Sequence, residues 1–238
     1  MAASDRATKY ALAGAALSLG EPIGLLIVRE VSGSGPVMME LWQERATYAY
    51  VFVTMAIVLS VVGYAVGRTA DRLAMLSETD SLTGLRNRRA FQQQLVQELR
   101  RAERYGSPMS LLVVDLDGLK QINDQHGHAA GDDAIRSVAS AITSTLRTSD
   151  LGARWGGDEF AMVLPNTDSA AARHSAERLF ARLSLASNGA GRAVTASVGI
   201  ATFDPAHARS TTAEQLEALA DRALYAAKAA GRNQIQVA

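Results

Sequence analysis

Two stretches of the sequence place acidic residues where apolar runs end. Asp115 and Asp117 follow the run MSLLVV, and residues two apart in a strand point to the same face. Asp158 and Glu159 lie in RWGGDEF, beside two glycines that are typical of a tight hairpin turn. If the two strands are neighbours, the carboxylates converge, and clustered carboxylates repel one another unless a cation binds or a pKa rises. Mg²⁺ is the predicted cation, because proteins hold it with one or two carboxylates together with substrate phosphates.

Each acidic pair alone has an ordinary structural interpretation. Asp115 and Asp117 alone are typical of a solvated strand end, and a glycine pair alone is typical of a turn. Their combination favours a site for phosphate chemistry. Glycines let the backbone approach a phosphate closely, while the adjacent acids offer metal ligands and a base for a ribose hydroxyl that attacks phosphorus.

The elements that would position these acids follow from the hydrophobic pattern. Strands are expected where the apolar run ends at Asp115, on both sides of the glycine pair, and over residues 193–203, with an edge strand at 234–238. Helices are expected over residues 91–106, 132–146, 169–183 and 213–231. This order predicts an α+β fold in which helices flank a central, mainly antiparallel sheet.

Two apolar segments precede this domain. Residues 10–28 contain a single charge, Glu21, and residues 49–67 contain none, and each has about the ~20 residues that cross a bilayer. We therefore predict a two-helix transmembrane anchor over residues 1–67 and a cytoplasmic linker helix over 68–79, ahead of a catalytic domain over 80–238. A signal peptide is disfavoured for the first segment because no clear small-residue cleavage site follows it. Glu21 and Pro22 have two open interpretations, a functional intramembrane acid or an interfacial break.

The basic residues around the two segments predict the topology. Arg6 and Lys9 precede the first segment, and Arg68 and Arg72 follow the second. The positive-inside bias then places both termini, and with them residues 80–238, in the cytoplasm, with the chain as a multi-pass membrane protein. The connecting segment, residues 29–48, is too short for a folded sensory domain, so the sequence does not reveal the input signal.

The composition excludes several other classes of function. The 24 basic and 24 acidic residues give a net charge of zero, so no nucleic-acid partner is predicted. The chain has no cysteine, which excludes disulfides and thiol chemistry, and its four histidines form no zinc pattern.

The motif RWGGDEF resembles the signature of the diguanylate cyclase (GGDEF) family. Four further segments resemble motifs of that family in order and spacing: DSLTGLRNRRAF from Asp80, DLDGLKQINDQHGHAAGD from Asp115, ASVGIA from Ala196 and DRALYAAKAAGRN from Asp221. The resemblance extends from about Asp80 to the C-terminus and excludes the apolar segments. It implies a fold like that of nucleotide cyclases and polymerase palms.

The resemblance also implies a reaction. Two GTP molecules, one on each of two facing domains of a homodimer, would condense to cyclic di-GMP with loss of two pyrophosphates. Mg²⁺ or Mn²⁺ would be held by the side chains of Asp115 and Asp158 and the backbone carbonyl of Leu116. Glu159 would either activate the 3′-hydroxyl or bind metal. By the same resemblance, guanine would be bound by Asn123 and Asp132, and the phosphates by Lys120, Lys228 and Arg232. Gly156 and Gly157 would let the backbone approach the triphosphate closely.

The segment RTSD, Arg147 to Asp150, resembles the family's RxxD product-inhibition site, which Arg154 would complete. Asp80 is interpreted as structural, either pairing with an arginine or capping. The chain departs from the family at Gly118 and Leu119, where other members often carry aromatic residues, so local packing there must differ.

Two alternatives remain from the sequence. One is a non-catalytic receptor that binds cyclic di-GMP at Arg147 and Asp150 and signals through its membrane helices. The unbroken GGDEF signature argues against it. The other is a different nucleotide cyclase or polymerase-like enzyme with the same metal-carboxylate arrangement, which a preference for ATP would reveal.

Overall fold

The computed structural model describes residues 3–18, 27, 31, 42, 45–185, 194–206 and 211–238. Within it the chain forms two compact units, Met1–Ser77 and Glu78–Ala238. Glu21 and Pro22, for which the sequence left two interpretations, lie outside the described residues.

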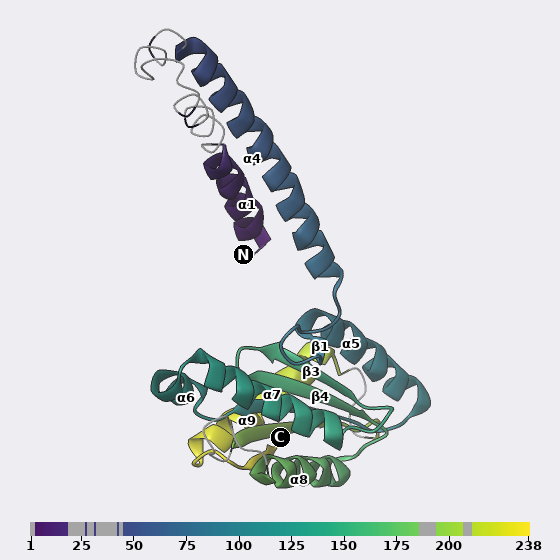
Figure 1. Cartoon of the computed structure of the whole chain (residues 1–238). Coiled ribbons are helices and arrows are strands. Elements are labelled where there is room, and N and C mark those ends of the chain that lie inside the picture. The colour runs from purple at the N-terminus through teal and green to yellow at the C-terminus, as the bar shows by residue number, and fades with distance from the viewer. Residues whose placement is uncertain are drawn as a thin grey trace. The chain divides into compact units, whose positions relative to one another are not determined.

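The described part of the first unit contains a pair of helices, α1 (Ala3–Leu17) and α4 (Arg45–Leu76). They cross where glycines let the backbones touch: a Cβ on Gly14 would clash with the carbonyl oxygen of Leu59, and one on Gly63 with that of Tyr10. Small residues at such a crossing allow close packing of helix backbones. The helices run in opposite directions (Figure 1).

Among the described residues, one helical stretch is long and apolar enough to cross a membrane, Arg45–Ala70 of α4, with a mean hydropathy of 2.2. It contains the second of the two predicted spans. α4 then continues as helix to Leu76 through most of the predicted linker. The first predicted span is matched only in part by α1, because the described helix ends at Leu17.

The described residues of the second unit form a six-stranded sheet of order β1-β3-β4-β2-β5-β6. The strands are β1 (Arg86–Asn87), β2 (Met109–Leu116), β3 (Leu151–Gly156), β4 (Glu159–Pro165), β5 (Ala196–Phe203) and β6 (Ile235–Val237). The central pairs β3–β4, β4–β2 and β2–β5 are antiparallel. The two edge pairs, β1–β3 and β5–β6, are parallel. The sheet is therefore mixed but mainly antiparallel, as the sequence predicted.

In the part of this unit that the structure describes, five helices cover the two faces of the sheet (Figure 1). Their bounds are α5 (Arg88–Tyr105), α6 (Leu119–His126), α7 (His128–Thr145), α8 (Ser169–Leu185) and α9 (Ala213–Ala229). Apolar residues of α7 and α8 pack on one face against alternate residues of β2 such as Leu112 and Val114. Residues of α5 and α9 pack on the other face against Leu111 and Val113. This alternation is the two-residue period of a strand buried on both sides.

Local sequence signals set the helix ends. The side chain of Asn87 accepts a hydrogen bond from the N–H of Ala90 at the start of α5, and Gly106 ends that helix in a left-handed conformation with φ 62°. Thr212 and Gln215 form a reciprocal capping box at the start of α9. The helix predicted from about residue 132 begins earlier, at His128, and α6 precedes it.

Candidate active site

The acidic residues of the two predicted strands meet at one end of the sheet. β2 and β4 are neighbours, and their register pairs Asp115 with Glu159. The backbone N–H of Leu116 donates to the carbonyl oxygen of Asp158 at 3.0 Å, which fixes the glycine-rich turn to the end of β2. The sequence left open whether these two strands are neighbours, and the structure shows that they are.

Asp115 is the most enclosed acid of this cluster, with only 6% of its surface exposed. Burial raises its pKa, and the negative charges of Asp158 and Glu159 raise it further, while a hydrogen bond and ion pair from Lys228 oppose the shift. Lys228 Nζ lies 2.7 Å from Asp115 Oδ2. The lysine thus supplies positive charge to a carboxylate group that would otherwise be destabilised by its neighbours.

The same electrostatics bear on the metal predicted from the sequence. Within the described residues, no three acidic or histidine side chains are gathered closely enough to form a complete metal site. However, Asp115 is destabilised by two neighbouring carboxylates that a cation would relieve. Mg²⁺ requires only one or two protein carboxylates, since phosphates and water complete its shell. Two carboxylates of this cluster, Asp115 and Asp158, and the Leu116 carbonyl are donors of the type that such a cation takes, and Glu159 lies beside them.

The turn between β3 and β4 presents its backbone to open space. A Cβ placed on Gly156 or Gly157 would meet no heavy atom within 4 Å. Gly157 has φ 49°, in the left-handed region that other residues rarely adopt, and the strand register shifts between Arg154 and Gly156. A phosphate could therefore approach the backbone here without displacing protein atoms.

Arg154 binds the backbone of the glycine-rich turn between β3 and β4. Its guanidinium donates two hydrogen bonds to the carbonyl oxygen of Gly157, at 3.1 and 2.8 Å, and approaches both carboxylate oxygens of Asp80 at 3.3 and 3.4 Å. Asp80 also accepts from the N–H and hydroxyl of Thr83. Burial raises the pKa of Asp80, but the Thr83 hydrogen bonds and the Arg154 charge outweigh it and leave the pKa below its ordinary value. Asp80 therefore pairs with an arginine, as predicted.

The two residues expected to bind guanine lie on helices that follow β2 directly. A Cβ on Gly131 of α7 would clash with Asn123 Oδ1 of α6, so the amide of Asn123 rests against the α7 backbone at Gly131. Asp132 is the next residue of α7, and both side chains are partly exposed. The fold therefore brings Asn123 close to the first turns of the helix that carries Asp132.

The residues expected to bind phosphates occupy three different settings. Lys120 is exposed at the start of α6. Lys228 is on the last turn of α9 and already pairs with Asp115. Arg232 is exposed in the loop after α9, with φ 65°.

The RTSD segment forms a turn between α7 and β3. The N–H of Arg147 donates to Asp150 Oδ2 at 2.9 Å, and the N–H of Asp150 donates to the carbonyl oxygen of Arg147 at 3.0 Å. The side chain of Arg147 is exposed. The side chain of Arg154, assigned to this segment from the sequence, is instead bound to Asp80 and Gly157.

A cavity of about 360 Å³ adjoins the acidic cluster on the face covered by α5 and α9. It is lined by Glu159 and Lys228 together with residues that the sequence did not single out: Arg88, Val113, Trp155, Asp221, Leu224 and Tyr225. The guanidinium of Arg88 lies 5.0 Å from the centre of the Trp155 ring, a cation–π arrangement. All of them except Val113 lie inside the motifs quoted from the sequence, but their meeting at one cavity depends on the fold and could not be read from any single motif.

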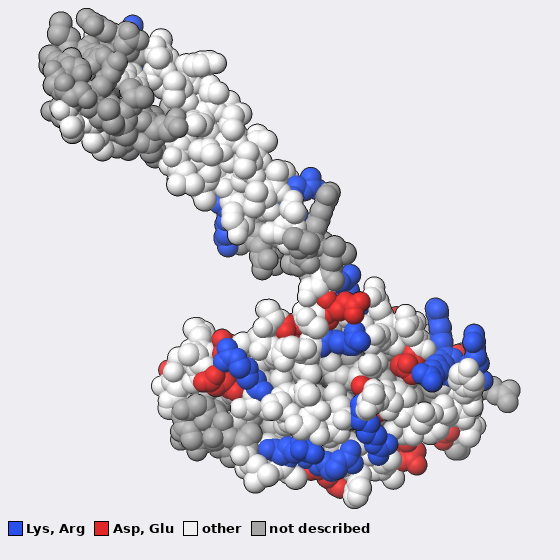
Figure 2. Space-filling model, turned by 45° about the vertical axis from the view of Figure 1, so that its right-hand side comes forward, with Lys and Arg blue, Asp and Glu red and all other residues white. Residues whose placement is uncertain are grey.

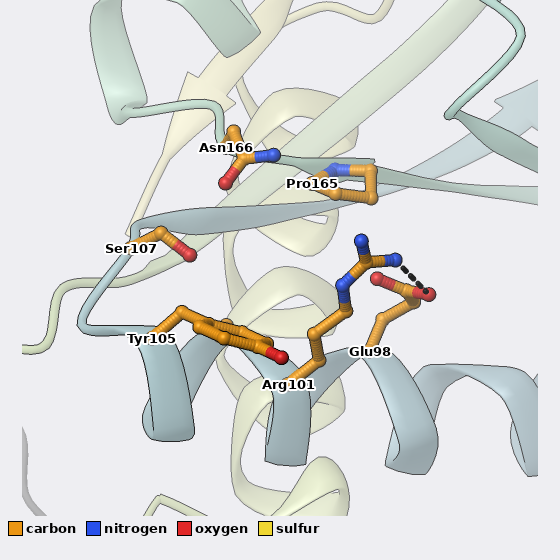
Figure 3. Close-up of a pocket in the computed structure, with 7 residues that line it drawn as sticks. Glu98, Arg101, Tyr105, Ser107, Pro165 and Asn166 are labelled. Carbon is orange, nitrogen blue, oxygen red and sulfur yellow. Dashed lines mark ion pairs between the residues drawn. The ribbon is translucent and has the colours of Figure 1, made fainter.

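A second cavity, of about 340 Å³, lies at the opposite end of the β2–β4 ladder (Figure 3). Pro165, which lines it, pairs with Met109, the residue at the far end of β2 from Asp115. Its arginine, Arg101, is paired with Glu98 at 3.7 Å. This cavity is separate from the acidic cluster.

The sequence of the chain matches a known protein family and is similar to curated proteins. Residues 77–234 match the family described as "Diguanylate cyclase, GGDEF domain". The chain is 41% identical over 163 residues to the diguanylate cyclase DgcP of Pseudomonas aeruginosa, covering 67% of this chain and 24% of DgcP. It is 39% identical over 162 residues to the diguanylate cyclase DosC of Escherichia coli, covering 66% of this chain and 34% of DosC. The chain thus spans about a quarter to a third of these curated relatives.

The fold is also similar to that of a solved GGDEF domain. The GGDEF domain of DgcB from Caulobacter crescentus, in complex with c-di-GMP, superposes with a TM-score of 0.62 at 34% identity, covering 67% of this chain and 92% of that domain. The matched part in each comparison is about the size of the Glu78–Ala238 unit.

Proposed function

The chain belongs to the diguanylate cyclase (GGDEF) family, and from that premise we propose that its Glu78–Ala238 unit condenses two GTP molecules into cyclic di-GMP. In each half of the reaction, the 3′-oxygen of one GTP bonds to the α-phosphorus of the other. The bond from that phosphorus to the β-phosphate oxygen breaks, and pyrophosphate leaves. Two such steps close the ring and release two pyrophosphates.

The observation that carries this proposal is the convergence at the ends of β2 and β4. Three carboxylates interact there electrostatically, one of them ion-paired to Lys228, beside a turn whose glycines face open space. Clustered carboxylates repel one another, which is unfavourable for stability, and a cation with a bound triphosphate would relieve that repulsion beside the accessible backbone. We propose Mg²⁺ or Mn²⁺ as the cation, held by Asp115, Asp158, the Leu116 carbonyl and, in one of two roles, Glu159. When bound, it would neutralise charge on the phosphates and on the leaving pyrophosphate.

The protein's own groups would bind and orient the substrate. Lys228 would exchange Asp115 for a phosphate oxygen when substrate enters, and Lys120 and Arg232 would hold the other phosphates. Gly156 and Gly157 would let the turn backbone approach the triphosphate. In its other role, Glu159 would accept the proton of the attacking 3′-hydroxyl, for which a carboxylate at the edge of the site is suited.

The guanine base would be read by Asn123 and Asp132. A carboxylate accepts hydrogen bonds from the N–H groups of guanine, while an amide can answer its acceptor groups. Adenine presents a different pattern of donors and acceptors, so these residues favour GTP over ATP.

We propose that the active form is a homodimer, with each protomer holding one GTP. A single GTP cannot supply both the attacking hydroxyl and the attacked phosphorus in the geometry of a cyclic dinucleotide. Joining two domains through their first units raises the effective concentration of one half-site near the other.

We further propose that the first unit is a membrane anchor in the bacterial inner membrane, with two spans and the catalytic unit on the cytoplasmic side. α4 exposes large apolar side chains such as Val53, Ile57 and Val61 at 52%, 59% and 63%. Among its described residues, the side of this unit seen in Figure 2 carries a long stretch without charged side chains, whereas charges of both signs are scattered over the second unit. An uncharged helix surface of this length favours lipid as its surroundings.

Product inhibition is proposed at Arg147 and Asp150. The exposed Arg147 guanidinium could stack on a guanine and bind phosphate, and Asp150 could accept from the base. Because Arg154 is bound to Asp80 and Gly157, the proposed inhibitory site rests on Arg147 and Asp150 alone.

The proposal is tested with the full chain in lipid, supplied with GTP and Mg²⁺ or Mn²⁺, by chromatography of the products. Cyclic di-GMP and pyrophosphate are expected, with a rate per chain that rises with protein density. Glu159→Gln should lower turnover at least about a hundredfold, the usual contribution of a general base. Glu177→Gln, an exposed acid on α8, is the matched control and should leave turnover unchanged.

Two outcomes would contradict the assignment. Absence of product across protein densities and lipids, with tight binding of cyclic di-GMP that Arg147→Ala abolishes, would favour the receptor. Turnover of ATP in preference to GTP would contradict the roles of Asn123 and Asp132.

A further inference from the structure

Asp117 lies two residues beyond Asp115 but does not join the acidic cluster. Its Oδ1 accepts a hydrogen bond from Ser197 Oγ at 2.8 Å, and its Oδ2 accepts from the backbone N–H of Asn233 at 3.1 Å. Its own N–H donates to the carbonyl oxygen of Thr195 at 2.9 Å. One carboxylate thus connects the end of β2, the start of β5 and the loop between α9 and β6.

That loop has a backbone conformation that side chains rarely adopt. Gly231, Arg232 and Asn233 have φ values of 114°, 65° and 46°, all in or near the left-handed region. Glycine tolerates this conformation and asparagine does so more readily than most, but arginine does not. Arg232 therefore holds its conformation because surrounding contacts fix it, and strain of this kind is often found at ligand-binding positions.

The contacts that fix the loop come from both of its sides. The N–H of Arg232 and the side-chain amide of Gln234 both donate to the carbonyl oxygen of Ala227, at 3.1 and 2.9 Å. On the sheet side, Asp117 binds Asn233, and the N–H of Val198 donates to the carbonyl oxygen of Gln234 at 2.9 Å. The bond from Asp117 is a side-chain contact that reaches the residue next to Arg232.

We propose that Asp117 is a positioning residue, which fixes the left-handed loop and so aims Arg232 at the triphosphate of the substrate. This inference rests on the proposed function, because it takes the phosphate role of Arg232 from it. A carboxylate suits this position because Ser197 and Asn233 both donate, and a carboxylate accepts at both oxygens without a donor of its own. Of the two aspartates that end β2, Asp115 therefore faces the substrate and Asp117 faces the loop.

The test measures ligand binding without turnover, using the full chain in lipid, a non-hydrolysable GTP analogue and guanosine as the probe without phosphates. Asp117→Ala should weaken binding of the analogue about tenfold to a hundredfold, which is the size of one lost charge-assisted hydrogen bond between Arg232 and a phosphate. Binding of guanosine should not change. Arg232→Ala should show the same pattern, and the double variant should bind no more weakly than Arg232→Ala alone.

Two further variants separate positioning from general stability. In Asp117→Asn, the remaining side-chain oxygen can take the place of Oδ2 and accept from Asn233, while the amide group donates to Ser197, whose hydroxyl can accept, so binding should be largely restored. Asp133→Ala, at an exposed aspartate paired with Arg136, should behave as the wild type.

Each outcome has a distinct meaning. If the wild type does not bind the analogue, the proposed function fails and this inference fails with it. If the wild type binds but Asp117→Ala binds equally well, only the inference is overturned. It is also overturned if guanosine binding falls as much as analogue binding, or if the losses from Asp117→Ala and Arg232→Ala add.

Discussion

Replacing Arg154 by alanine removes the support behind the glycine-rich turn. Two hydrogen bonds to the carbonyl oxygen of Gly157, at 3.1 and 2.8 Å, would be lost, and so would the ion pair with Asp80 at 3.3 Å. Both hydrogen bonds end on the single carbonyl oxygen of Gly157, so we count them together as about 2 kcal/mol of the free energy of unfolding. The ion pair adds about 1 kcal/mol, because its side chains are only 15% and 24% exposed and its distances are long. The expected loss is about 3 kcal/mol.

A second ion pair of the same unit provides the control. Arg136 and Asp133 are closer, at 2.7 Å, but both side chains are 51% exposed. If distance decided the energy, Arg136→Ala would be the more damaging change. Because solvent screens exposed charges and ordering long side chains opposes the gain, we expect Arg136→Ala to cost no more than about 0.5 kcal/mol.

The loss at Arg154 should also depend on pH. The pKa of Asp80 in the folded chain lies below its ordinary value of 3.8, so the ion pair stabilises the fold above that pH and the contribution disappears as pH falls through the folded pKa. The difference in unfolding free energy between wild type and Arg154→Ala should therefore shrink by about 1 kcal/mol between pH 7 and strongly acidic pH. The bonds to Gly157 do not titrate and should account for the remainder.

Urea unfolding of residues 78–238, a compact unit with its own two cores, followed by circular dichroism gives these free energies. A loss from Arg154→Ala no larger than that from Arg136→Ala would refute the argument that Arg154 supports the turn. A loss that does not change with pH would refute the contribution of Asp80.

Three further predictions concern other parts of the chain. Gly157→Ala should lower the unfolding free energy by about 1 kcal/mol, because Gly157 has a left-handed φ. Gly156→Ala should leave the unfolding free energy unchanged but weaken binding of a GTP analogue. Equal stability losses of the two variants in urea would contradict this prediction. Asp115→Asn should raise stability at pH 7 while abolishing turnover, because burial and the neighbouring carboxylates raise the pKa of Asp115 and its charged form therefore destabilises the fold. The gain should vanish below that pKa, and a loss of stability at pH 7 would count against the prediction. Gly63→Leu should separate α1 from α4, because the leucine side chain would occupy the space of the Tyr10 carbonyl. Cysteines introduced on the two facing helices should then cross-link more slowly than in the wild type. Cross-linking at an unchanged rate would contradict the close helix crossing.

The sequence predicted those parts of the site that depend on local pattern. The apolar runs before Asp115 and after Glu159 are typical of central strands, but only the register of the structure shows that these strands are neighbours and that their acids meet. The glycine pair predicted a turn, which the structure has. The mainly antiparallel sheet was predicted, but the parallel pairing of β1 with β3 was not, because β1 is only two residues long and carries no strand pattern.

Other parts depend on contacts between distant residues. The partner of Arg154 is 74 residues away in sequence, and motif position alone assigned its side chain to the inhibitory segment. The cavity lined by Arg88, Trp155 and Tyr225 joins three elements of the fold. The left-handed conformation of Arg232 could not be expected from its residue type, since arginine disfavours it.

The bond between Asp117 and Asn233 spans 116 residues, a large part of the second unit. A ribosome releases the chain from its N-terminus at about 5–20 residues per second, so the Asp115 cluster emerges many seconds before the loop that completes it. For most of that time β2 lacks its β5 partner, and a nascent chain that stops short of Asn233 lacks the bond from Asp117 that holds Arg232 in place. A chain cut before Asn233 would therefore keep β1 to β5 but lack the bond from Asp117 that positions Arg232.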